Sequence, residues 1–212
     1  MDIVSFLGIW CVILSVSFVW PQAFRVVRHN TPQGVSPLGT VHAIAGSVQW
    51  FVFGLMESDI AVYVANGSYV IAQCVIASVL LRHRTLTSPL FVAGVLLSIV
   101  IALSAAFVSS SAVGVMAIII STSSVFPPVV HVYRTHNLHG LSVVSLAITL
   151  MSVISWFFYG LAQSDFIVLA PNLVFAPCVS YMLIRAYRWH HSGEGREYAA
   201  STSVASYSNP GA

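Results

Sequence analysis

Two stretches of this chain, WFVFGLMESDIAVYVAN (Trp50–Asn66) and WFFYGLAQSDFIVLAPN (Trp156–Asn172), have closely similar sequences. Each position in the second stretch lies 106 residues after its counterpart in the first, and the alignment needs no gap. Tryptophan, glycine, aspartate and asparagine all recur in step, which shared hydrophobicity alone would not produce. The pattern indicates an internal duplication, and it sets the expected fold.

The match continues on both sides of these stretches at the same spacing. The further pairs are Ser15 with Ser121, Pro21 with Pro127, Arg28 with Arg134, Gly34 with Gly140, Ser36 with Ser142, and Arg82 with Arg188. We therefore expect residues 1–85 to form one repeat and residues 109–190 the other. Residues 86–108 have no counterpart and lie between the repeats as a linker.

The composition places the chain in a membrane. Of its 212 residues, 58% are hydrophobic and only 7% are charged, whereas a soluble domain carries about 25% charged residues. Seven apolar runs each approach the ~20 residues that a helix needs to cross hydrocarbon. They lie at residues 3–23, 38–56, 60–81, 89–108, 112–133, 141–161 and 166–188. None alternates as barrel strands do, so we expect an all-α membrane protein with seven transmembrane helices.

Charge placement predicts the orientation of these helices. All eight basic residues are arginines, and they flank the ends of the first, third, fifth and seventh runs or lie in the C-terminal tail. Asp2, Glu57, Asp59 and Asp165 lie at the opposite ends. By the positive-inside rule the N-terminus faces out and the C-terminus is cytoplasmic, most simply across the plasma membrane. Residues 191–212 read as a disordered cytoplasmic tail.

The count of crossings predicts how the repeats are arranged. Three spans and the linker make an even number, so both repeats enter the membrane in the same orientation. We expect two parallel three-helix bundles joined by a linker helix, a 3+1+3 arrangement. In transporters built this way, the substrate site lies at the repeat interface near the midplane of the bilayer.

Two tryptophans and two asparagines are candidate ligand-binding residues. Trp50 and Trp156 lie about seven residues, roughly 10 Å, inward from an acidic turn. Asn66 and Asn172 lie at a similar depth on the following spans. A carboxamide in hydrocarbon needs hydrogen-bond partners, and interhelical bonding is one way to supply them. Indole faces beside amides also suit a neutral, polyhydroxylated ligand, which is the reading we favour.

The prolines are candidate hinges. Pro21 and Pro127 lie near the cytoplasmic ends of the first and fifth spans, where a proline kinks a helix or ends it. Their recurrence in both repeats favours hinges. Pro37, near the start of the second span, is a candidate of the same kind, although its counterpart is Val143.

Several chemistries are not expected from this sequence. No acidic or basic residue lies in the middle of a span, which favours facilitated diffusion over ion coupling. His42 is the nearest exception, and we interpret it as a satisfied core residue. No nucleophile–base pattern, metal-ligand cluster or cofactor motif is recognisable, and no basic patch suits nucleic acid. We expect a non-enzyme without cofactor or metal, whose partners are the lipid bilayer and a small solute.

These residues resemble the SWEET sugar transporters and their half-size relatives, the SemiSWEETs, of the PQ-loop clan. The shared motif is Trp50, Gly54, Asp59 and Asn66 with Trp20-Pro21-Gln22, repeated as Trp156, Gly160, Asp165 and Asn172. The resemblance implies a bidirectional sugar uniporter working by alternating access, with Trp50, Asn66, Trp156 and Asn172 lining the sugar pocket. It also implies hinge roles for Pro21, Pro37 and Pro127, and suggests homo-oligomers. Two alternatives are a proton-coupled PQ-loop amino-acid transporter and a non-transporting membrane scaffold.

Overall fold

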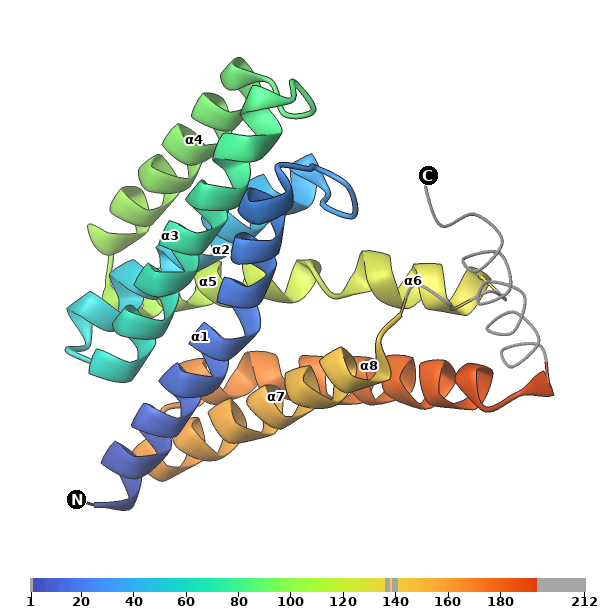
Figure 1. Cartoon of the computed structure of the whole chain (residues 1–212). Coiled ribbons are helices and arrows are strands. Elements are labelled where there is room, and N and C mark those ends of the chain that lie inside the picture. Colours follow the sequence, from blue (N-terminus) through green and yellow to red (C-terminus); the bar gives the residue numbers. More distant parts are fainter. Residues whose placement is uncertain (1, 136–137, 139–140, 194–212) are drawn as a thin grey trace.

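The structure, a computed structural model, describes residues 2–135, 138 and 141–193. Within these residues the secondary structure is helical and contains no strand. The helices are α1 (Ile3–His29), α2 (Pro37–Met56), α3 (Ile60–Arg82), α4 (Ser88–Ala106), α5 (Ser110–Ser123), α6 (Phe126–Arg134), α7 (Val143–Gln163) and α8 (Phe166–His190) (Figure 1). The tail predicted for residues 191–212 lies outside the described residues from position 194 onward.

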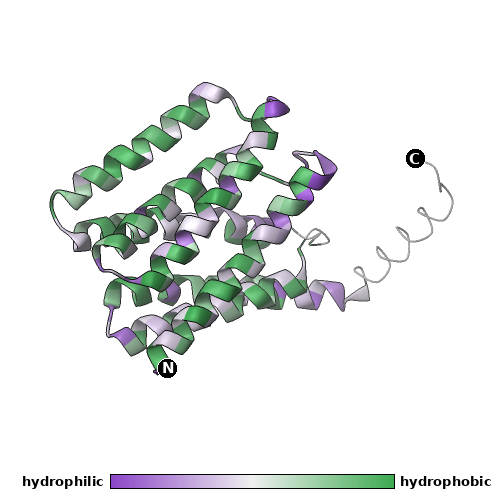
Figure 2. Ribbon diagram, turned by 60° about the vertical axis from the view of Figure 1, so that its left-hand side comes forward, coloured by the Kyte–Doolittle hydropathy of each residue, from purple (hydrophilic) through white to green (hydrophobic). Residues whose placement is uncertain are grey.

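Seven helical stretches of the described chain are long and apolar enough to cross a membrane, judged by length and composition. All but one are single helices, and the exception joins α5 and α6 over Ser110–Arg134. Hydrophobic residues cover the helices, and hydrophilic residues gather toward their ends and the connecting loops (Figure 2). The predicted fold class, an all-α protein with seven spans, is confirmed.

Duplicated polar residues start the helices of both repeats. The side chains of Ser36 and Ser142 accept a backbone N–H at the starts of α2 and α7, over 3.1 and 3.2 Å. Those of Asp59 and Asp165 do the same for α3 and α8, over 3.0 and 2.8 Å. N-caps of this kind satisfy amide groups that the first turn leaves without partners. The duplication therefore preserved helix starts as well as apolar spans.

The two bundles contact each other reciprocally. In the first repeat α3 packs against both α1 and α2, and in the second α8 packs against α7, α5 and α6. Between the repeats α2 packs against α5, and α1 packs against α7. The linker helix α4 packs against α2 and α5. Figure 1 shows the bundles close together near the N-terminus and diverging toward the ends of α3 and α8.

The fifth span is broken, although the sequence predicts one helix over residues 112–133. α5 ends at Ser123, and α6 begins at Phe126 with Pro127 and Pro128 in its first turn. Two successive prolines leave the carbonyls one turn earlier without N–H donors, and their rings clash with that turn. The equivalent helix α1 contains only Pro21 and is continuous from Ile3 to His29. The repeats therefore differ where their prolines align.

The candidate hinge prolines occupy different helical positions. Pro21 lies inside α1, whereas Pro37 and Pro127 lie in the first turns of α2 and α6. In a first turn the missing N–H of proline costs no hydrogen bond.

Two glycines let one helix lie directly against the backbone of the next inside each bundle. A Cβ atom on Gly54 would lie 2.7 Å from the backbone nitrogen of Tyr63, and one on Gly160 would lie 2.8 Å from that of Leu169. Both contacts are to backbone, which cannot move aside as a flexible side chain can. Since Gly54 and Gly160 are repeat partners, α2 against α3 and α7 against α8 are packed in the same way.

We predict that Gly54→Ala and Gly160→Ala each lower the melting temperature of the detergent-solubilised protein. Overpacking of this kind costs about 1–3 kcal/mol. Gly46→Ala is the matched control, because a Cβ there would meet its nearest neighbours at 3.7 Å. Equal melting temperatures for the three variants, measured by circular dichroism, would contradict this account of the packing.

Candidate ligand-binding site

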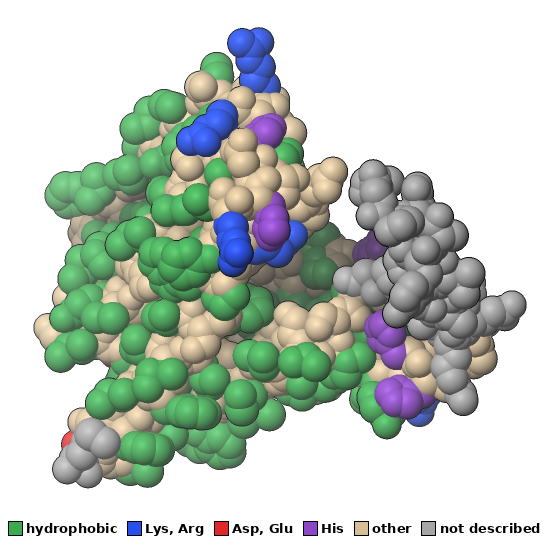
Figure 3. All heavy atoms as spheres, viewed as in Figure 1, with side chains coloured by type: hydrophobic (Ala, Val, Ile, Leu, Met, Phe, Trp, Pro, Cys, Tyr) green, Lys and Arg blue, Asp and Glu red, His purple; other side chains and the backbone are tan. Residues whose placement is uncertain are grey.

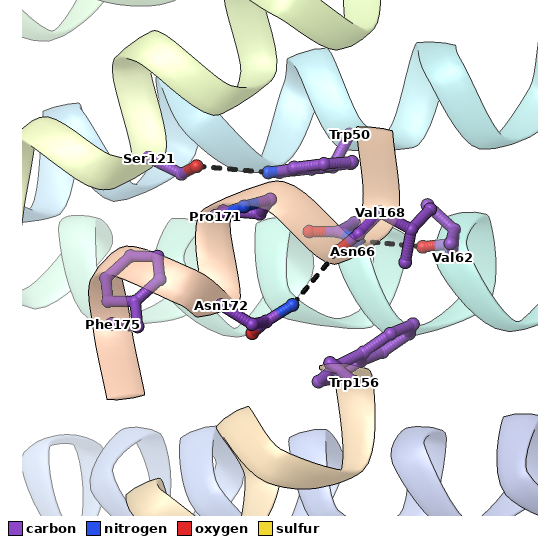
Figure 4. A pocket seen from close by; sticks show the side chains of 9 residues that line it. All are labelled: Trp50, Val62, Asn66, Ser121, Trp156, Val168, Pro171, Asn172 and Phe175. Atoms are coloured by element: carbon purple, nitrogen blue, oxygen red, sulfur yellow. Dashed lines mark hydrogen bonds between the residues drawn. The ribbon is translucent and has the colours of Figure 1, made fainter. Parts of the chain in front are cut away.

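The four candidate residues of the sequence line one cavity between the two bundles. Trp50 comes from α2, Asn66 from α3, Trp156 from α7 and Asn172 from α8. The cavity has a volume of about 500 Å³. Its other lining residues are Val62, Ser121, Val168, Pro171 and Phe175. In Figure 4 the two indole rings lie on opposite sides of the asparagines.

Each indole is held by a hydroxyl group of the other repeat. Trp50 Nε1 donates to Ser121 Oγ, and Trp156 Nε1 donates to Ser15 Oγ, both over 3.3 Å. Ser15 and Ser121 are themselves repeat partners, so the two bonds are the same interaction made in opposite directions. The bonds use the ring edges and fix where the flat faces of the indoles lie.

Aromatic neighbours hold the indoles from a second direction. Trp50 meets Phe53 edge to face, with ring centroids 5.7 Å apart, and Trp156 meets Tyr159 in the same way at 5.5 Å. Such perpendicular contacts are favourable because the ring edge is positive and the face negative. Each tryptophan is therefore fixed within its own repeat and across to the other.

The two carboxamides are also bound identically. Asn66 Nδ2 donates to the Val62 carbonyl and Asn172 Nδ2 to the Val168 carbonyl, both over 2.9 Å and one helical turn back (Figure 4). Among the described residues no further hydrogen bond to either amide is found. Each amide therefore keeps one N–H and its oxygen available for a ligand.

The chemistry of the cavity suits a neutral ligand. Its nine described lining residues are aromatic, aliphatic, hydroxyl-bearing or amide-bearing, and none carries a charge. A charged ligand would lose its hydration here without meeting an opposite charge. Flat apolar faces and amides together match a ring that has C–H faces and hydroxyl groups at its edge.

A wider cavity of about 1390 Å³ continues from the site toward the arginine-bearing ends of the helices. It shares Trp50, Asn66 and Ser121 with the smaller cavity and reaches Ser36 and Pro127 at the starts of α2 and α6. Figure 3 shows a hollow between the two halves of the molecule, beside the arginine and histidine side chains. The site is therefore open on this side.

His42 borders the wider cavity and joins the repeats. Its Nε2 lies 2.8 Å from the carbonyl oxygen of Ile120 and 3.2 Å from the hydroxyl of Ser123, both on α5. Because a carbonyl only accepts hydrogen bonds, this ring nitrogen donates to it. This ring nitrogen therefore has partners, but the half-buried imidazole lines the open path and does not lie in the core that the sequence analysis expected.

Three residues at the acidic ends of the helices close the other side, and we call Asp59, Tyr159 and Gln163 the latch. Tyr159 Oη donates to one oxygen of the Asp59 carboxylate over 2.7 Å, and Gln163 Nε2 donates to the other over 2.8 Å. Asp59 belongs to the first repeat, whereas Tyr159 and Gln163 lie on α7 of the second. Hydrogen bonds to a carboxylate are stronger than neutral ones, so the latch holds the repeats together here.

The latch is made on one side of the pseudo-twofold axis only. Its counterparts in the other repeat are Asp165, Phe53 and Glu57. Phe53 lacks the hydroxyl, and in the described structure Asp165 accepts only backbone N–H groups of its own helix. Sequence reasoning missed Tyr159 and Gln163, because their role has no repeat partner to reveal it. Ser15 and Ser121, by contrast, were visible as a repeat pair.

We predict that Tyr159→Phe opens the acidic side of the site. Removing a hydrogen bond to a charged group costs about 1.5–3 kcal/mol, which changes the ratio of closed to open forms by roughly 10- to 100-fold. The readout is labelling of Val62→Cys, in protein without native cysteines, by an impermeant thiol reagent added on the acidic side.

Gln163→Ala is expected to act in the same direction, and Glu57→Ala is its repeat-matched control. Labelling that rises equally in all three variants, or in none, would contradict a role for the latch in closure.

No protein-family model matches the chain. Over 66 residues the chain is 37% identical to the sugar transporter SemiSWEET of Escherichia coli (strain UMEA 3162-1), covering 31% of this chain and 74% of that protein. The fold is similar to the structure of a eukaryotic SWEET transporter, with a TM-score of 0.75 and 14% identity, over 90% of this chain and all of the other.

Proposed function

Because the chain belongs to the SWEET and SemiSWEET family, we propose that it carries small neutral sugars across a membrane by facilitated diffusion. The observation that most supports this is the uncharged cavity with two indole faces and two carboxamides. The C–H faces of a sugar ring stack on Trp50 and Trp156. Its hydroxyl groups bond to the free N–H and oxygen of Asn66 and Asn172.

The proposed mechanism is alternating access by a uniporter. With the latch closed, a sugar reaches the site through the wide cavity on the arginine-bearing side. The bundles then rock about their interface: the latch opens while the start of α2 and helix α6, which line the wide cavity, approach each other. Pro21, Pro37 and Pro127 are the proposed hinges, and the break before Pro127 already separates α5 from α6. Because no coupled ion is required, net flux follows the sugar gradient in either direction.

The proposed orientation follows from the charges. The protein is an integral membrane protein, and we place the arginine-bearing ends in the cytoplasm by the positive-inside rule. The form with the closed latch is then open to the cytoplasm, with the N-terminus outside. We propose the plasma membrane as its location, and homo-oligomers as its state there.

We predict that Asn66→Ala and Asn172→Ala abolish sugar flux into proteoliposomes without unfolding the protein. Each change removes a donor and an acceptor from the site, while the short side chain of alanine leaves the helix intact. Gln33→Ala is the control, because Gln33 carries an exposed amide outside the cavity. Flux equal to that of the wild type in both asparagine variants would remove these residues from the mechanism.

A proton-coupled amino-acid carrier is the competing function, since the imidazole of His42 lines the path. We predict that uptake of glucose or sucrose into proteoliposomes occurs without a pH gradient and does not accumulate sugar when one is imposed. Uptake of cationic amino acids driven by the gradient, with no sugar flux, would establish the competitor. Absence of flux for every solute would instead support a scaffold.

A further inference from the structure

The repeats meet along two seams that the duplication makes equivalent: α2 against α5 and α1 against α7. The linker helix α4 lies against the first seam and is bonded to it. Gln49 Nε2 on α2 donates to the Ser98 carbonyl of α4 over 2.9 Å, and Ser98 Oγ donates to the Ala45 carbonyl over 3.3 Å. The first seam is thus covered by a helix of the chain itself.

The second seam carries an open groove of about 920 Å³. Its lining residues are Phe6, Leu7 and Trp10 of α1 and Ile154, Ser155 and Phe158 of α7. Phe6 and Phe158 are 52% and 51% exposed. The repeat counterparts of Leu7 and Ser155 are Val113 and Gln49, which are both fully buried in the seam that α4 covers. The groove therefore lies at the place equivalent to the one that α4 fills.

The polar groups of this groove are already paired. Trp10 Nε1 donates to Ser155 Oγ over 3.1 Å, and Ser155 Oγ donates to the Met151 carbonyl over 2.8 Å. At the equivalent position Gln49 instead reaches out of its seam to the backbone of α4. The groove accordingly offers an occupant only hydrocarbon and ring surfaces. Its chemistry favours a purely apolar occupant over a helix that brings its own polar groups.

We propose that an acyl chain of a bilayer phospholipid occupies the groove between α1 and α7, in the place that α4 takes on the other seam. An unbranched chain can follow the floor of the groove between Phe6, Trp10 and Phe158. There it makes many small dispersion contacts with the walls of the groove. The indole of Trp10 is held by Ser155, so this wall is formed before the chain binds.

The groove lies directly behind the latch. A Cβ atom on Gly8 of α1 would lie 3.1 Å from the ring of Tyr159, so α1 touches the latch tyrosine itself. Leu7 and Phe158, the preceding neighbours of Gly8 and Tyr159 in the chain, line the groove. Opening the latch changes the spacing of α1 and α7 and hence the shape of the groove. Because the groove has its present shape while the latch is closed, a chain bound in it favours the closed latch. This consequence rests on the proposed alternating access, whereas occupancy of the groove does not.

The test uses the full-length protein in liposomes that contain phosphatidylcholine with a photoactivatable diazirine on its acyl chain. After illumination, mass spectrometry locates the lipid adducts along the chain. Adducts are expected to concentrate on residues 154–158 of α7, several-fold above those on the lipid-facing residues of α4. Ile154→Trp fills the groove and should reduce the adducts on α7 several-fold.

Ile9→Trp is the matched control, because Ile9 lies on α1, is 52% exposed and does not line the groove, whereas Ile154 is 44% exposed. Its adducts should equal those of the wild type. If Ile154→Trp does not fold, Ile154→Phe provides a smaller filling change. Adducts spread evenly over all lipid-facing helices would overturn the proposal. Cross-links from this groove to a second copy of the chain would also overturn it. So would labelling of the groove by a photoactivatable sterol but not by the phosphatidylcholine probe.

Discussion

An indole N–H inside a membrane protein must find an acceptor, and the indoles of Trp50 and Trp156 each find it in the opposite repeat. Trp50 donates to Ser121 and Trp156 to Ser15, so one bond type, used twice, joins the bundles on both sides of the cavity. In hydrocarbon no water replaces a lost partner, so the two repeats must lie where each of these indoles can reach its serine. The same bonds orient the indole faces, so the contact that assembles the repeats also shapes the site.

The departures from symmetry gather on different seams. A single chain with two parallel repeats needs a linker helix, and α4 can lie over only one seam. That seam carries the bonds of Gln49 to Ser98 and of His42 to α5. The latch lies beside the other seam and joins Asp59, at the start of α3, to Tyr159 and Gln163 of α7. The cavity is therefore nearly symmetric between the repeats, whereas its acidic side is closed by hydrogen bonds that only one side of the molecule makes.

The two ends of the cavity differ in what holds them. At the acidic end a carboxylate accepts two side-chain hydrogen bonds from the partner repeat, and the helices pack closely. At the arginine-bearing end the bundles diverge, and the fifth span is broken before two prolines. A path that is firmly bonded at one end and open at the other is one of the two forms that alternating access requires.

The amino-acid sequence by itself determined the membrane class, the seven spans, the duplication and the identity of Trp50, Asn66, Trp156 and Asn172 as unusual residues. Each of these appears as composition, as an apolar run or as a match at constant spacing, and none depends on a contact. Only the tertiary structure placed the four side chains around one cavity, joined Tyr159 to Asp59 and left a groove on one seam. Those features arise from side chains far apart in the chain whose repeat counterparts differ, as Tyr159 does from Phe53, and a pattern of repeats reveals only what both copies keep.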